Sequence, residues 1–115
     1  MKLADRNNPV TLGELREMAA GMFGDLVKAV VDLKREVMAL DAELHADEEA
    51  FLIEHGSIQE DLWGINLYPA LEGEDFVEFD SLINLRPSQG NWSRSVEHSP
   101  TRERILGIVA QLVVT

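Results

Sequence analysis

Apolar and polar residues alternate along residues 76–86, and this is the clearest periodic pattern in the chain. A period of two is typical of a β-strand with one buried and one exposed face. The positions on the apolar face are Val77, Phe79, Ser81, Ile83 and Leu85. The opposite face, interrupted only by Leu82, carries Glu78, Asp80, Asn84 and Arg86. We therefore predict a strand that presents two carboxylates, an amide and a guanidinium on one surface.

A second alternating segment, residues 63–68, precedes this strand and ends at Pro69. Residues 69–75 between them are rich in turn formers, so the two strands should pair antiparallel. Placing Asn66 opposite Glu78 puts Gly64 opposite Asp80. In this register the polar face of one strand continues onto the polar face of the other, and the apolar faces match in the same way. Because Gly64 has no side chain, it leaves a gap that could admit a ligand or another backbone.

Residues 25–40 fit two patterns. The positions that alternate as in a strand are Val27, Ala29, Val31 and Leu33. Apolar residues from Leu26 to Leu44 also form a helical stripe, but a helix over 25–54 would exceed the usual length of about 8–20 residues. We predict two strands, 26–33 and 36–40, joined around Lys34 and Arg35, although this turn has neither Gly nor Asn.

Three other segments have helical spacing and recognisable start signals. Thr11 and Glu14 form a capping box at the start of the first helix. Asp41 is the expected N-cap of a second helix, which Gly56 closes. The pair Ser99-Pro100 opens the last helix, with Ser99 as N-cap and Pro100 at the first helical position.

The predicted order of elements is α-β-β-α-β-β-α in a single domain over residues 1–115. An irregular lead-in, with room for a short edge strand, covers 1–10, and a long polar loop covers 86–99. We expect an α+β fold in which a small antiparallel sheet has helices packed mainly on one face. At 115 residues the chain has room for one core.

The net charge of −11 is unevenly spread, because no Lys or Arg occurs between Glu36 and Leu85. Such a field repels a phosphate backbone and argues against nucleic acid as a partner. No segment approaches the roughly 18 apolar residues of a membrane span, and the chain contains no cysteine. We expect a cytoplasmic protein whose acidic surface is either simply solvated or attracts a cation or a basic partner.

A weak metal-binding pattern occurs in and after the second predicted helix. His45 and Glu49 are one turn apart on the same face, and Asp61 follows the helix. These three could hold a divalent metal ion, the one cofactor that the residues suggest, if the fold brings them together. The alternative is an exposed acidic helix with an ordinary surface histidine, with Asp61 as a turn residue.

Candidate ligand-binding residues lie on the polar strand faces and in the loop that follows, namely Asn66, Glu78, Asp80, Asn84, Arg86, Gln89 and Asn91. Our first hypothesis is a binding or interaction module that recognises a small ligand or a protein partner through the acidic sheet face and residues 86–94. The alternative is a small metal-assisted hydrolase or acid–base enzyme that uses Glu78 and Asp80 with Arg86. An internal ion-pair network would explain the same row of residues without any site.

Apolar residues cover much of the circumference of the last predicted helix, and they include Ile105, Leu106, Ile108 and Val109. A helix that is apolar over such a wide arc can also bury surface against another molecule. A homodimer is therefore a third possibility.

Three motifs resemble those of an uncharacterised family of small prokaryotic single-domain proteins, a domain of unknown function. The motifs are ELHAD at 43–47, QEDLWGINLYP at 59–69 and FDSLINLRPSQGN at 79–91. The resemblance extends from about Thr11 to the end of the chain. It implies a stand-alone cytoplasmic domain, and it brings no established activity, cofactor or substrate.

Overall fold

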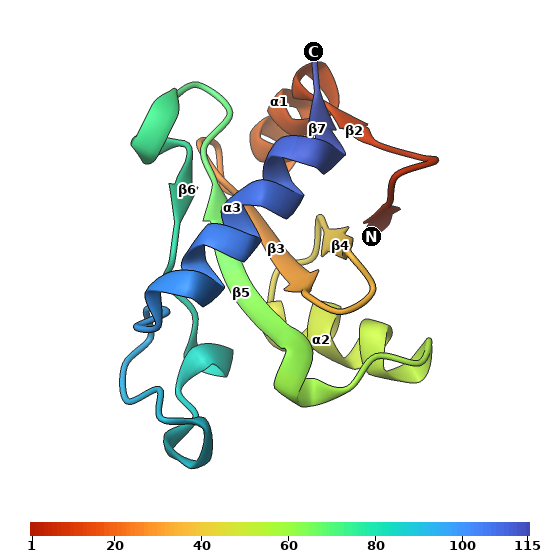
Figure 1. Ribbon diagram of the computed structural model, residues 1–115. Coiled ribbons are helices and arrows are strands. Elements are labelled where there is room, and N and C mark those ends of the chain that lie inside the picture. The colour runs from red at the N-terminus through yellow and green to blue at the C-terminus, as the bar shows by residue number, and fades with distance from the viewer.

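A five-stranded antiparallel sheet forms the centre of the computed structural model, which describes residues 1–115 (Figure 1). The strands lie in the order β1 (Lys2–Ala4), β4 (Val37–Leu40), β3 (Val27–Asp32), β5 (Leu62–Leu67) and β6 (Val77–Glu78). Three helices, α1 (Leu12–Gly21), α2 (His45–Glu54) and α3 (Ser99–Leu112), complete the fold. The α+β prediction is confirmed.

The helices lie on both faces of the sheet, two on one side and one on the other. Strand periodicity explains this, because Val31 and its neighbour Val30 point to opposite faces. Val31 belongs to a large core of 19 buried residues that includes Leu15 of α1 and Ile105 of α3. Val30 packs instead with Leu52 of α2 in a smaller cluster. In Figure 1, α3 crosses the sheet on the side nearer the viewer and α2 lies behind it.

The central hairpin β3–β4 confirms the strand interpretation of residues 25–40. Its turn needs neither Gly nor Asn because Asp32, which is fully buried, organises it. Asp32 Oδ1 accepts hydrogen bonds from the amides of Lys34 and Arg35, both at 2.9 Å, and Glu36 takes the positive φ of 56°. An aspartate that bonds its own following amides is an Asx turn, which replaces the missing turn residues.

Helix starts agree with the sequence in one case of three. The Thr11–Glu14 capping box of α1 is present as predicted. Helix α2 has Leu44 as its N-cap and begins at His45, three residues later than expected, because Asp41 has a φ of 71° and cannot enter a right-handed helix. Helix α3 includes Ser99, and His98 occupies the N-cap position.

The lead-in contains two strands. β1 forms the edge of the sheet beside β4, and β2 (Val10–Thr11) pairs in parallel with β7 (Val113–Val114) after α3. The second element of the chain and the last one therefore lie side by side (Figure 1). None of the three helices is both long enough and apolar enough to cross a membrane.

The prediction of one strand through residues 76–86 is wrong beyond Glu78. The expected register, Asn66 opposite Glu78, is present. After it the chain leaves the ladder, forms a 3₁₀ turn at Leu82–Asn84 and a second at Pro87–Gln89. The reason is that the Asn84 side chain bonds the backbone of Gly64 and so takes the place of the next strand residue.

Candidate functional site

The predicted polar row is divided between the surface and the interior. Glu78 is exposed and Asp80 is half-exposed, whereas Asn84 and Arg86 are buried. This inverts the expectation for the last two residues, which had been assigned to the solvent-facing side. Only the N-terminal part of the row, next to Asn66, keeps the predicted arrangement.

Asn66 and Glu78 are joined directly across β5 and β6. Asn66 Nδ2 donates to Glu78 Oε1 at 2.8 Å and to the carbonyl oxygen of Asp80 at 3.2 Å. Tyr68 donates its hydroxyl proton to the same Glu78 oxygen at 3.1 Å. The Asn66 Oδ1 atom is buried and has no hydrogen-bond partner.

Asn84 and Ser81 together close the gap at Gly64. Asn84 Oδ1 accepts from the Gly64 amide at 2.8 Å, and Asn84 Nδ2 donates to the Gly64 carbonyl at 2.9 Å. A Cβ atom at Gly64 would lie 2.6 Å from both Cβ and Oγ of Ser81. The space left by this glycine is therefore filled by the protein's own chain, and no ligand can use it.

Arg86 is tied to backbone carbonyls, which it cross-links. Its Nε donates to Ile83 O at 3.0 Å, its Nη1 to Gln59 O at 2.6 Å, and its Nη2 to Leu62 O. The guanidinium also stacks on the Trp63 ring, 4.2 Å from its centroid. Burial lowers the pKa of Arg86, and the charge of Glu49 opposes that shift. Because its donors are engaged in this way, the Arg86 guanidinium stabilises the fold and has no pair of free N–H groups with which to bind an anion.

Gln89 and Asn91 organise the polar loop in a similar way. Gln89 accepts from Arg86 Nη1 and donates to Glu60 O at 3.1 Å. Asn91 is 3% exposed, donates to the carbonyls of Asn84 and Ser95, both at 2.7 Å, and accepts from the Glu97 amide at 2.9 Å. The loop residues that looked like ligand contacts satisfy the loop's own backbone.

The metal candidates His45, Glu49 and Asp61 do not converge. His45 Nε2 is 2.8 Å from the carbonyl oxygen of Ile65, whereas Glu49 lies near Gln59 and Arg86. Asp61 belongs to a short 3₁₀ turn before β5. No three His, Cys, Asp or Glu side chains in the structure lie close enough together to hold a metal ion.

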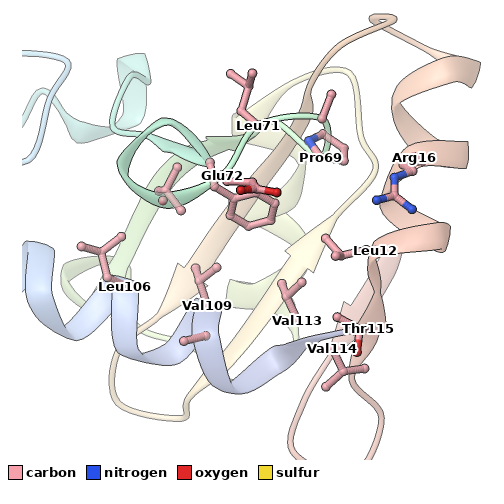
Figure 2. A pocket seen from close by; sticks show the side chains of 15 residues that line it. Leu12, Arg16, Pro69, Leu71, Glu72, Leu106, Val109, Val113, Val114 and Thr115 are labelled. Carbon is pink, nitrogen blue, oxygen red and sulfur yellow. The ribbon is translucent and has the colours of Figure 1, made fainter.

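The largest cavity lies elsewhere, on the α1 and α3 side of the sheet (Figure 2). It has a volume of about 490 Å³, and ten of its 15 lining residues are hydrophobic. Helix α1, the loop after β5, α3 and β7 all contribute, with Leu12, Phe76, Leu106, Val109 and Val113 among the apolar residues. Ligand cavities in proteins are commonly about 300–1,000 Å³ and predominantly apolar, so this one has both properties.

Local sequence explains why the cavity is open. Pro69 cannot donate a ladder hydrogen bond, so β5 ends and the chain turns back through residues 69–76. Around the mouth of the cavity, the apolar side chains of Leu71, Leu106 and Val114 are 46%, 43% and 40% exposed. Neighbouring exposed apolar residues of this kind mark binding surfaces more often than isolated ones do.

Two opposite charges border the apolar cavity. Figure 2 shows Arg16 on α1 and Glu72 on the 69–76 loop, on different sides of the space. Neither side chain takes part in any ion pair or hydrogen bond of the structure. An apolar lining with few polar groups at its edge can both hold a ligand and orient it.

None of the residues that line this cavity was among the sequence-based candidates. The one signal in the sequence is the broad apolar arc of the last helix, which is also compatible with a homodimer. Leu106 and Val109 of that arc in fact line the cavity. The remaining lining residues come from the first helix and from the loop at 69–76, and no local motif marks them.

Comparison with known proteins identifies a family but no individual relative. The family described as "Protein of unknown function (DUF5674)" matches residues 6–112. No curated protein and no solved structure matches the chain.

Proposed function

We propose that this protein, which belongs to the DUF5674 family of proteins of unknown function, is a binding module for a small ligand with an apolar body. The observation that carries the proposal is the cavity of about 490 Å³ with its mainly hydrophobic lining. The ligand's apolar part would lie against Leu106 and Val109, and its polar end would reach Arg16 or Glu72 at the mouth.

Burial of apolar surface supplies the affinity in this proposal. Each methylene group transferred out of water contributes about 0.8 kcal/mol, before the cost of immobilising the ligand. A ligand of roughly ten non-hydrogen atoms at about 0.3–0.8 kcal/mol per atom would bind with a dissociation constant in the millimolar to micromolar range. A charged group at the mouth adds selectivity, because Arg16 favours a carboxylate and Glu72 an amine.

Composition bears on the cellular location of the protein and on its classes of partner. The absence of cysteine and the net charge of −11 are compatible with a cytoplasmic prokaryotic protein. The same charge disfavours nucleic acid and anionic membrane surfaces as partners. Among enzymatic alternatives, the pairing of Glu78 and Asp80 with Arg86 has little support, because Arg86 is engaged with Gln59, Ile83 and Leu62.

A second copy of the chain is the competing occupant of the cavity mouth. The exposure of Leu71, Leu106 and Val114 favours this candidate, since a dimer could cover all three. Light scattering coupled to size-exclusion chromatography separates the two. A monomer of about 12.9 kDa would leave the mouth free for a ligand.

Thermal unfolding with octanoate and octylamine as probes tests the proposal. At a hundred times its dissociation constant, a probe that binds only the native state adds about 2.7 kcal/mol, which raises the melting temperature by several degrees. Ala110 lines the cavity, so Ala110→Trp should fill it and abolish the shift. Ala20→Trp on the exposed side of α1 is the matched control and should keep the shift. Equal shifts in both variants, or none in the wild type, would contradict the proposal.

A further inference from the structure

A small cavity of about 150 Å³ lies on the α2 side of the sheet. Its lining comes from Lys28 on β3, from the start of α2, from residues 81–83, and from Arg94. It shares no lining residue with the apolar cavity. In a chain with 21 acidic and 10 basic residues, this cavity is lined by two cationic side chains and by no carboxylate.

The two cations keep donors available. Lys28 takes part in none of the three ion pairs, and its Nζ lies over the Phe23 ring, 4.9 Å from the centroid. Arg94 is anchored through Nε, which is 2.6 Å from Asp80 Oδ1. Its two Nη atoms make no hydrogen bond in the structure. Lys28 is half-buried and has no ion-pair partner, so it favours an anion near it, because screening by solvent is reduced there. The Arg94 side chain is 55% exposed and already paired with Asp80, so it contributes only its free Nη donors.

The first turn of α2 adds main-chain donors to the same cavity. Its N-cap, Leu44, has no side-chain acceptor, so no capping hydrogen bond forms. Leu44, His45 and Ala46 all line the cavity, and the amides of His45 and Ala46 have no hydrogen-bond acceptor. Free amides at a helix N-terminus bind anions, and the helix dipole contributes in the same direction.

The His45 ring is an independent indication, because it is 8% exposed and lines the cavity with one nitrogen unpartnered. Nε2 must donate to Ile65 O, since a carbonyl oxygen can only accept, so Nδ1 keeps its lone pair. Burial lowers the pKa of His45, which favours this neutral form. A ligand that carries both negative charge and one proton, such as hydrogen phosphate, can satisfy Nδ1 as well as the cations.

We infer that this cavity is a binding site for a small oxyanion of the phosphate or carboxylate class. Lys28, Arg94 and the α2 amides would hold the charged oxygens, and His45 Nδ1 would accept a hydrogen bond from the hydroxyl of a ligand that keeps a proton, such as hydrogen phosphate. The site goes beyond the proposed function, because it lies on the opposite side of the sheet and takes a different class of ligand.

Titration of the isotope-labelled full chain with inorganic phosphate and with acetate, followed by amide NMR shifts at constant ionic strength, tests the inference. We expect saturable shifts centred on the amides of His45, Ala46 and Ser81. Saturation by phosphate alone would indicate an oxyanion that keeps a proton, and saturation by both would indicate the wider class.

Lys28→Gln should weaken binding by a factor of about five to ten, whereas Lys34→Gln, which removes the same charge from an exposed turn, should not. Thermal unfolding checks that Lys28→Gln folds, and Arg94→Gln in the same titration replaces it if it does not. Shifts that fail to saturate, spread over the surface, or are equal in Lys28→Gln and the wild type would overturn the inference.

Discussion

Buried polar residues hold together the segment that follows β6. Asn84 pairs with both backbone groups of Gly64, and Ser81 occupies the space that a side chain at position 64 would need. The polar residues in this segment therefore work as substitutes for secondary structure. Buried amide side chains are suited to this role, because they carry a donor and an acceptor in the same spacing as a peptide group.

Substituting Gly64→Ala should destabilise the fold by about 1–3 kcal/mol, because the new methyl group would lie 2.6 Å from Ser81 Cβ and Oγ. Urea unfolding measures the change. The control is Gly107→Ala in α3, where a Cβ would meet no atom within 4 Å and the alanine should stabilise the helix by up to about 1 kcal/mol. Equal effects of the two substitutions would contradict this account of Gly64.

At the scale of elements, sequence patterns predicted the central hairpin, the register of β5 against β6 and the cap of α1. The same patterns failed for 76–86 because alternation reports which residues are apolar, not which backbone groups have partners. The Asn84 side chain provides a hydrogen-bond partner for the backbone of Gly64, 20 residues away in sequence. A contact over this sequence separation produces no periodic pattern of apolar and polar residues. The start of α2 was misplaced for a related reason, since the positive φ of Asp41 depends on its tertiary setting.

Helix α2 also carries a buried acid that should make stability depend on pH. Glu48 is fully buried, its Oε2 accepts from the Ala42 amide at 3.1 Å, and its Oε1 has no partner. Burial, reinforced by Asp41 and Asp47, raises the pKa of Glu48 to about 9. The folded state therefore keeps this carboxyl protonated in a range where the unfolded chain has already ionised it.

Because the folded pKa is the higher one, the stability that Glu48 contributes is complete below its unfolded value of 4.5 and is lost as the pH rises towards 9. The loss is at most about 1.4 kcal/mol per pH unit. Glu48→Gln should remove this slope, so the variant gains on the wild type between pH 5 and pH 8. Urea unfolding at both pH values measures it, and Glu54→Gln at the exposed end of α2 is the control. Parallel pH profiles for wild type and Glu48→Gln would show that Glu48 ionises freely in the fold.

Considered as a whole molecule, the apolar cavity and the cavity beside α2 lie on opposite sides of one sheet, and neither could be located from sequence. The apolar cavity combines residues from 12–16, 69–77 and 106–115, which only the closed fold brings together. Most of the predicted site residues are polar and close together in sequence. Polar residues such as Arg86 and Asn91 satisfy this pattern, but their side chains donate hydrogen bonds to backbone carbonyl groups of the protein itself.

The most direct measurement of the central claim is an amide NMR titration of the labelled wild-type protein with octanoate and octylamine below their aggregation concentrations. If the apolar cavity is the ligand site, the amides of Leu12, Val109 and Val113 will shift together and saturate with one dissociation constant. Arg16→Gln should weaken octanoate selectively, and Glu72→Gln should weaken octylamine. Shifts confined to other parts of the chain, or none with either probe, would contradict a ligand-binding role for this cavity.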